Sequence, residues 1–260
     1  MSKTKIEFNL NKDNGFFWNV EILEDINSQY QNIKVIQHDF FGKALLLDNH
    51  IMFSEYDEHI YHEMAAYPNL MVLKKLDNAL IIGGGDCLLA KRILETNVKK
   101  IDQVEIDKKV VDISQKYFSG ILGNTLNDKR LNIHYEDALK FEFKNKYDFI
   151  LLDLTDPQED NQLSNQLFNR DYYLKCKNYL VNSGIMTVQI GCPYLFKEHF
   201  EQQTIELQSI FKHVFVYGKF MHCFGMHQYF ISCSDTISFS DNQIKKAKHF
   251  IFDFEVQARM

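Results

Sequence analysis

The sequence predicts an α/β protein in which a small N-terminal β domain, residues 1–57, precedes a doubly wound, mostly parallel sheet, residues 58–260. Three observations support this prediction. Residues 1 to about 56 contain short β-type runs with no intervening helix of useful length. From Glu58 onward helical and strand patterns alternate, which is typical of parallel sheets with helical crossovers. Finally, residues 80–87 read LIIGGGDC, an apolar run that breaks into glycines before a helix.

The N-terminal part consists of apolar and β-branched runs that predict strands. The expected strands are residues 6–10, 16–23, 33–36 and 44–53, the last interrupted by a turn at Asp48 and Asn49. Such a module has too little core to be very stable alone. We therefore expect it to pack on the rest of the chain or on a second subunit.

The remainder of the chain alternates between the two kinds of element. Helices are expected at residues 58–67, 87–96, 108–118, 166–180 and 195–211, with Pro68 ending the first. Strands are expected at residues 79–82, 101–106, 131–135, 149–152, 185–190, 213–217 and 228–234. Ligands of doubly wound sheets bind beyond the carboxyl ends of the strands. We therefore expect the chemistry at residues 83–86, 105, 136–137, 153–157 and 189.

The glycine turn is suited to a nucleoside ligand. At a helix N-terminus the backbone N–H groups are free, and Glu105 at the end of the next strand can accept hydrogen bonds from both ribose hydroxyls. The usual dinucleotide pattern needs a third glycine where this chain has Leu88, and Asp86 would repel a pyrophosphate. The turn therefore favours an adenosine-bearing ligand that carries a positive charge close to the turn, such as a sulfonium nucleoside.

Composition excludes several classes of function. A net charge of -6 and a pI near 5.9 argue against a nucleic-acid partner, which requires clustered Lys and Arg. No apolar run approaches the roughly 18 residues that span a bilayer, and the N-terminus lacks the apolar region of a signal peptide. Five scattered cysteines without a C-x-x-C pair indicate reduced thiols. We expect a cytoplasmic protein without membrane contact.

A metal site is not expected. His59 and His62 lie three residues apart on a predicted helix, beside Glu58 and Glu63, which is a spacing that metal ligands can adopt. No further His or Cys cluster is placed to complete such a site.

Acidic residues gather where the predicted strands end. Five of them follow four successive strands: Asp86, Glu105, Asp137, Asp153 and Asp156. Any one of them could simply cap a turn between a strand and a helix. Because the carboxyl ends of parallel strands share one edge, the convergence of all five there is harder to explain by capping alone.

Several of these segments, in this order and spacing, resemble the polyamine aminopropyltransferases, the spermidine synthase family. They are Leu47 with Asp48, EYDEHIYHEM at residues 55–64, the glycine turn, EID at residues 105–107 and DLTDP at residues 153–157. The likeness covers most of the chain from about residue 18 to residue 234.

The resemblance implies a β domain followed by a Rossmann-like, methyltransferase-type sheet. It further implies transfer of an aminopropyl group from decarboxylated S-adenosylmethionine to putrescine or a related diamine, with release of methylthioadenosine. The donor is a co-substrate, so no resident cofactor is expected. The family also implies a homodimer or homotetramer whose other partners are small molecules.

Site residues follow from the resemblance by position. The catalytic set is Asp153 as proton acceptor, Asp156 as its partner at the attacking nitrogen, and Tyr61. The donor nucleoside would be held by Gln31, Gly83, Gly85, Asp86, Glu105, Asp137 and Ala138. The amine would be bound by Trp18, His62, Asp86, Asp156 and Gln189.

The chemistry explains why the reaction needs these carboxylates. An alkylamine of pKa about 10 is roughly one part in a thousand neutral at pH 7, a cost of about 4 kcal/mol, so a carboxylate must take its proton. Mutual repulsion among Asp86, Asp153 and Asp156 would raise at least one pKa. Asp86 would also disfavour intact S-adenosylmethionine, whose own carboxylate would lie near it.

The chain departs from the family pattern around the amine. Cys87 replaces a glycine, residues 158–162 replace the expected lid sequence, and residues 220–227 read FMHCFGMH where the family has Ile-Pro-Thr-Tyr. Two alternatives therefore stay open. One is an S-adenosylmethionine-dependent methyltransferase, which shares the nucleoside half. The other is a non-catalytic paralogue that binds nucleoside or polyamine.

Overall fold

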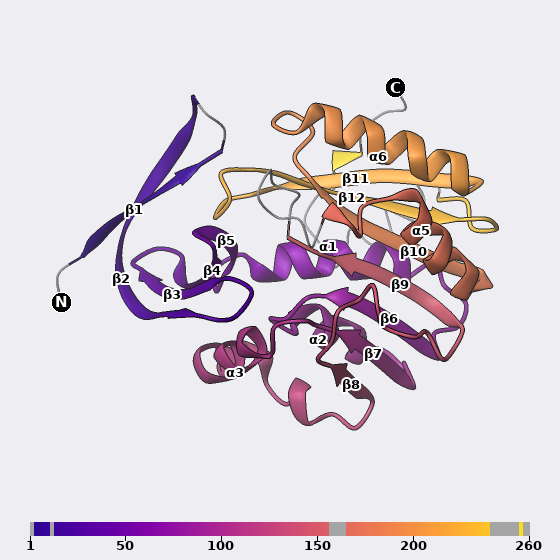
Figure 1. Ribbon diagram of the computed structural model, residues 1–260, viewed down its shortest axis with the longest axis horizontal. Coiled ribbons are helices and arrows are strands. Elements are labelled where there is room, and N and C mark those ends of the chain that lie inside the picture. Colours follow the sequence, from indigo (N-terminus) through magenta and orange to yellow (C-terminus); the bar gives the residue numbers. More distant parts are fainter. Residues whose placement is uncertain (1–2, 11–12, 156–164, 240–254, 257–260) are drawn as a thin grey trace.

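The protein, seen here as a computed structural model, contains two β-sheets (Figure 1). Residues 3–10, 13–155, 165–239 and 255–256 are described. The N-terminal sheet is antiparallel, in the order β1-β2-β3-β4-β5. Its strands are β1 (Thr4–Asn9), β2 (Gly15–Asn27), β3 (Asn32–His38), β4 (Gly42–Leu47) and β5 (His50–Ser54). Asp48 and Asn49 form the predicted turn, both with positive φ, as a two-residue hairpin requires.

The larger sheet has eight strands in the order β13-β11-β12-β10-β9-β6-β7-β8. These are β6 (Asn78–Gly83), β7 (Lys100–Val104), β8 (Leu131–His134), β9 (Tyr147–Asp153), β10 (Leu180–Gly191), β11 (His213–Met221), β12 (Met226–Ser234) and β13 (Glu255–Val256). From β8 to β10 neighbouring strands are parallel, whereas β12 runs antiparallel to both of its neighbours. The predicted Rossmann-like, doubly wound sheet is confirmed. The chain order reverses between β6 and β9, where such sheets bind ligands.

Helices cover both faces of the large sheet. They are α1 (Glu58–Leu70), α2 (Leu88–Leu94), α3 (Lys108–Leu122), η1 (Thr125–Asn127), α5 (Arg170–Tyr179) and α6 (Lys197–Ile210). The prediction that Pro68 ends the first helix was wrong, since α1 continues to Leu70 with Pro68 inside it. Proline removes one helical N–H donor. In that turn the Asn69 side chain donates to the Ala65 carbonyl at 3.0 Å, which adds a local hydrogen bond.

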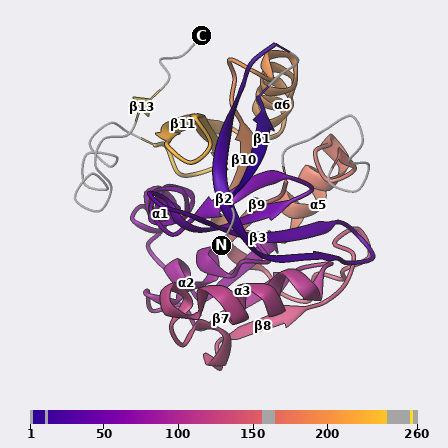
Figure 2. The ribbon, with the colours of Figure 1, turned by 90° about the vertical axis from the view of Figure 1, so that its left-hand side faces the viewer.

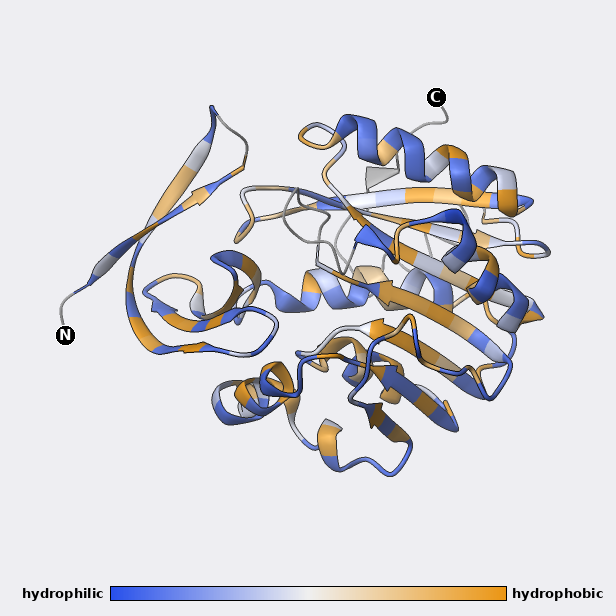
Figure 3. Cartoon of the chain, in the orientation of Figure 1, coloured by the Kyte–Doolittle hydropathy of each residue, from blue (hydrophilic) through white to orange (hydrophobic). Residues whose placement is uncertain are grey.

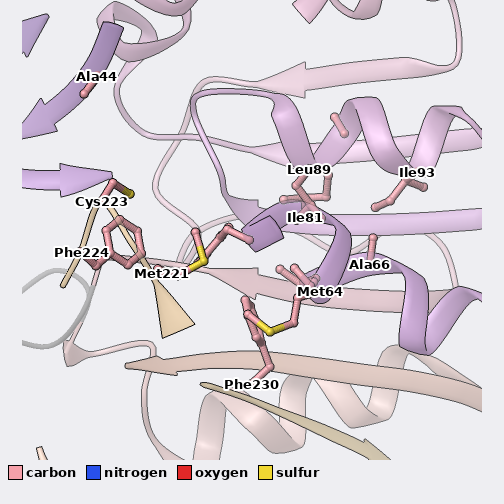
Figure 4. Packing of buried hydrophobic residues seen from close by; sticks show 14 of the residues in the cluster. Ala44, Met64, Ala66, Ile81, Leu89, Ile93, Met221, Cys223, Phe224 and Phe230 are labelled. Atoms are coloured by element: carbon pink, nitrogen blue, oxygen red, sulfur yellow. The ribbon is translucent and has the colours of Figure 1, made fainter. Parts of the chain in front are cut away.

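Alternating side chains of the central strands build two cores. On β6, Ile81 packs with α1 and α2, whereas Leu80 and Ile82 face the core that contains residues of α5 and α6. Figure 4 shows the first core from close by, with Met64 of α1, Leu89 of α2 and Ile81 around one another. The hydropathy colouring in Figure 3 shows the matching pattern, with apolar residues along β6 and β9 and polar residues on the outer side of α6.

The N-terminal sheet packs on the rest of the chain, one of the two arrangements expected from the sequence. Val20, Ile36 and Leu46 belong to the same apolar core as α1, and α3 packs on β3, β4 and β5 in a separate cluster. Figure 2 shows the sheet in front of the parallel strands, with α3 below it. A cleft lined by residues of both sheets lies between them.

Two further observations concern composition. All five cysteines are buried and free. In the described part of the chain, no helix combines the length and the apolar character needed to cross a membrane.

Candidate active site

A cleft of about 1060 Å³ lies where the N-terminal sheet meets the carboxyl ends of β6, β7 and β9. The N-terminal sheet contributes apolar side chains to it, and the parallel sheet contributes glycines and carboxylates. Among the residues lining it are Leu45, Leu47, Ile51, Met52, Gly83, Gly84, Gly85, Asp86, Glu105, Asp137, Ala138, Asp153 and Gln189. Most sequence-predicted site residues are therefore in one compartment.

The glycine turn fits closely against the end of β9. Gly83 is paired with Asp153 in the sheet and has φ +85, and the Gly84 N–H donates to the Asp153 carbonyl at 3.0 Å. A Cβ on Gly85 would lie 2.9 Å from the Glu105 carboxylate. The glycines thus bring backbone and carboxylates together at a spacing that side chains would prevent.

Asp86 lies two residues before the start of helix α2. One of its oxygens, Oδ1, accepts a hydrogen bond from the Leu88 N–H at 2.8 Å. Cys87 between them adopts a left-handed conformation with φ 63 and is fully buried. Burial raises the pKa of the Cys87 thiol, so the group is a neutral packing residue and not a thiolate nucleophile.

Glu105 extends from the end of β7 into the cleft. Its Oε1 accepts from the Asp107 N–H at 2.8 Å. Burial raises the pKa of the Glu105 carboxyl to about 7, against the lowering effect of that N–H. Gln31 reaches the same strand end indirectly, because its Nε2 donates to Asp107 Oδ2 at 3.0 Å.

Asp153 stands at the end of β9 and faces the same cleft. The Tyr61 hydroxyl donates to its Oδ1 at 2.6 Å. Burial, followed by the charge of Asp86, raises the pKa of Asp153 to about 6, while His62 and the Tyr61 hydrogen bond oppose the rise. The repulsion expected between the cleft carboxylates is therefore present for Asp86 and Asp153.

Two expected amine contacts do not line the cleft. His62 is 1% exposed and lies behind Asp86. Trp18 is 6% exposed and stacks on Phe41 with ring centroids 4.6 Å apart, inside the apolar core. Both residues face inward because their rings pack against aromatic side chains of the N-terminal domain, His62 against Phe53 and Trp18 against Phe41. Asp156 lies outside the described residues.

The structure adds cleft residues that the sequence did not single out. Phe224, Met226 and Gln228 enter the cleft from the turn between β11 and β12 and from the start of β12. Gln228 is 1% exposed, and no described residue accepts a hydrogen bond from its Nε2. The only sequence signal was the departure of residues 220–227 from the family pattern, which gave no residue to transfer by position.

No group of three His, Cys, Asp or Glu side chains that could hold a metal ion occurs within the described ranges.

The raised pKa of Glu105 predicts a pH-dependent stability. An unfolded Glu titrates near 4.5 and the folded one at about 7, so the folded protein binds more protons between these values. This contribution to the free energy of unfolding is complete below pH 4.5 and is lost as pH rises through 7. Glutamine at this position is neutral at every pH. As pH rises from 5 to 8, we therefore expect the free energy of unfolding of Glu105→Gln to increase by roughly 3 kcal/mol relative to that of the parent.

Thermal unfolding of the ligand-free parent and variant at both pH values measures this gain. An equal difference in Tm between the two proteins at pH 5 and at pH 8 would contradict the prediction.

Comparisons with known proteins agree with this geometry. Residues 58–242 match the model of the spermine/spermidine synthase domain, and residues 17–55 match that of the spermidine synthase tetramerisation domain. A polyamine aminopropyltransferase of Prochlorococcus marinus strain AS9601 is 40% identical over 205 residues, which are 77% of this chain and 71% of that one. Its counterpart from Prochlorococcus marinus subsp. pastoris is 39% identical over 217 residues, 82% of this chain and 74% of that one.

Solved structures show the same fold. A spermidine synthase in complex with the transition state analogue AdoDATO superimposes with a TM-score of 0.86 at 24% identity, over 98% of this chain and 88% of the other. The spermidine synthase of Thermotoga maritima gives a TM-score of 0.84 at 24% identity, over 98% of this chain and 87% of the other.

Proposed function

The chain belongs to the spermine/spermidine synthase family and is a polyamine aminopropyltransferase, and we propose that its donor is decarboxylated S-adenosylmethionine and its acceptor putrescine or a related diamine. The observation that supports these substrates most directly is the pair Asp86 and Asp153 in one cleft, beside Glu105. A methyl-transfer site has no need of two carboxylates where a second cation would bind.

The donor would occupy the glycine turn. Glu105 would accept hydrogen bonds from the ribose hydroxyls, Asp137 and Ala138 would border the adenine, and Gly83 and Gly85 would allow close backbone approach. Gln31 would support this arrangement through Asp107. Asp86 would bind the ammonium of the aminopropyl arm, where a carboxylate is worth most because the cleft is partly shielded from water.

The acceptor would lie between the donor and Asp153. The nitrogen–carbon bond forms as the carbon–sulfur bond breaks, methylthioadenosine leaves as a neutral thioether, and the proton from the attacking nitrogen passes to Asp153. With a pKa of about 6, Asp153 is ionised at neutral pH and ready to accept that proton. Tyr61 fixes the orientation of its carboxylate, and Gln189 and Asp156 would complete the amine side.

Three further proposals concern cofactors, assembly and location. The donor brings its own leaving group, so the reaction requires no metal and no resident cofactor. The N-terminal match is to a tetramerisation domain, which supports assembly into a homodimer or homotetramer through that sheet. Five free cysteines support a cytoplasmic location.

A purified-enzyme assay tests the substrates. With decarboxylated donor and putrescine we expect release of methylthioadenosine, and we expect calorimetry to give at least about tenfold weaker binding of intact S-adenosylmethionine, because its carboxylate would face Asp86. Tight binding of the intact donor with weak binding of the decarboxylated one would favour a methyltransferase. Binding of the decarboxylated donor without product, across a panel of diamines, would favour the non-catalytic alternative.

A further inference from the structure

Four side chains of alternating charge form a row that runs from helix α2 to the cleft. Arg92 Nη2 donates to Glu58 Oε1 at 3.0 Å, Glu58 Oε2 lies 2.9 Å from His62 Nδ1, and His62 Nε2 lies 3.5 Å from Asp86 Oδ1. The first three residues are at most 8% exposed, and only Asp86 lines the cleft. The row therefore connects the cleft carboxylate to a cation inside the protein.

The neighbours of His62 determine where its protons are. Nδ1 lies 2.7 Å from the Glu58 backbone carbonyl, which can only accept, so Nδ1 must carry a proton. Nε2 faces the Asp86 carboxylate, and a bare nitrogen there would set its lone pair against an anion. An imidazolium, with a proton on each nitrogen, satisfies both neighbours.

Carboxylates from three packed segments favour that cation. Glu58 faces it from α1, Asp86 from the glycine turn and Asp153 from β9, with Arg92 of α2 behind Glu58. The rings of Phe53 and Tyr61 pack against the imidazole, and Glu63 and Glu95 flank Arg92. Burial alone would lower the pKa of His62, but Asp86 and Glu58 raise it to about 10.

We infer that His62, held by Glu58 and Arg92, is a positioning residue: its buried positive charge fixes Asp86 and offsets the repulsion between Asp86 and Asp153, so that Asp153 is ionised and able to accept a proton in the empty cleft. His62 does not contact the substrate and acts through the two carboxylates. The sequence predicted His62 on the amine, and the inference assigns it a different role. The inference rests on the proposed function, because that function has Asp86 bind the donor's ammonium and Asp153 accept the proton.

The inference predicts a displaced pH profile. Glutamine can keep hydrogen bonds at position 62 but carries no charge, so in His62→Gln the Asp153 carboxyl should ionise only at higher pH. We expect the acid limb of kcat/KM to move up by about one pH unit, with roughly fivefold lower activity at pH 6 and recovery near pH 8.5. A loss of activity that is uniform across pH would mean that His62 is only structural and would overturn the inference.

His134→Gln is the matched control. His134 Nε2 pairs with Asp102 Oδ1 at 3.0 Å on the same sheet, but neither residue lines the cleft. This variant should retain the pH profile of the parent. If both variants displace the acid limb equally, the effect is not specific to the row and the inference fails.

A second measurement does not depend on turnover. Nitrogen-15 spectra of the parent at pH 8.5 should show the His62 ring with both nitrogens protonated, and Glu58→Gln should move its titration to lower pH. A neutral ring at pH 8.5 would overturn the inference. An inactive parent whose His62 is nevertheless protonated would instead count against the proposed substrates, which separates the two failures.

Discussion

Replacing Asp153 by asparagine is expected to lower kcat by about 10²–10⁴-fold, the usual size of a lost general base. Asparagine keeps the shape of the side chain and can still accept the 2.6 Å hydrogen bond from Tyr61. It cannot take a proton from the attacking amine, so chemistry fails while the cleft retains its form. Affinity for the donor should change little, because Asp86 and Glu105 are untouched.

The matched control is Asp148→Asn, which makes the same substitution at the other end of β9. Asp148 Oδ2 accepts from the backbone N–H groups of Asp77 and Asn78 at 2.8 and 2.9 Å, and none of the three residues lines the cleft. We expect it to lower the free energy of unfolding by about 1–2 kcal/mol and to leave kcat unchanged. Single-turnover rates and calorimetric donor binding compare the two variants. An Asp153→Asn enzyme with the parental kcat would exclude Asp153 as the proton acceptor.

The fold was largely predictable because its elements depend on local pattern. The alternation of helix and strand beyond Glu58 and the turn at Asp48 and Asn49 both appear in the structure where the sequence places them. The end of α1 could not be predicted from Pro68, because that turn is buried and the Asn69 side chain in it is held by hydrogen bonds with Tyr217 and Ser232. Those are tertiary effects.

The carboxylates of the site were predictable for a topological reason. Asp86, Glu105 and Asp153 each follow a parallel strand, and neighbouring strands β6, β7 and β9 end at one edge. The sequence therefore brings them together without any knowledge of their side-chain contacts.

The sequence did not predict which side chains face the ligand and which lie behind the carboxylates of the cleft. His62 follows Tyr61 directly, yet one reaches Asp153 through its hydroxyl and the other is buried behind Asp86. The difference depends on how α1 is rotated against α2, where Glu58 meets Arg92. Gln228 enters the cleft from the start of β12, directly after residues 220–227, whose sequence departs from the family pattern, so neither pattern nor resemblance identified it.

Gly83→Ala should be the most damaging small substitution in the cleft, with an expected loss of about 2–5 kcal/mol in the free energy of unfolding. An alanine at φ +85 costs about 1–2 kcal/mol, and overpacking adds about 1–3 kcal/mol. The overpacking is severe because the new Cβ would lie 2.2 Å from the Asp153 carbonyl. That oxygen cannot retreat easily, since it accepts the Gly84 N–H and belongs to the paired end of β9.

Gly120→Ala provides the comparison, because the same methyl group is added where there is room. Gly120 lies in α3, and beyond the backbone of that helix no described atom comes within 4 Å of the point where a Cβ would stand. Alanine there should raise the free energy of unfolding by about 0.5–1 kcal/mol. Denaturant unfolding of both variants measures the difference.

Since the strain at Gly83 falls on Asp153 itself, any folded Gly83→Ala protein should also have a reduced kcat. A variant with parental stability and parental kcat would mean that the glycine turn and β9 are not held together as tightly as their hydrogen bond and register indicate.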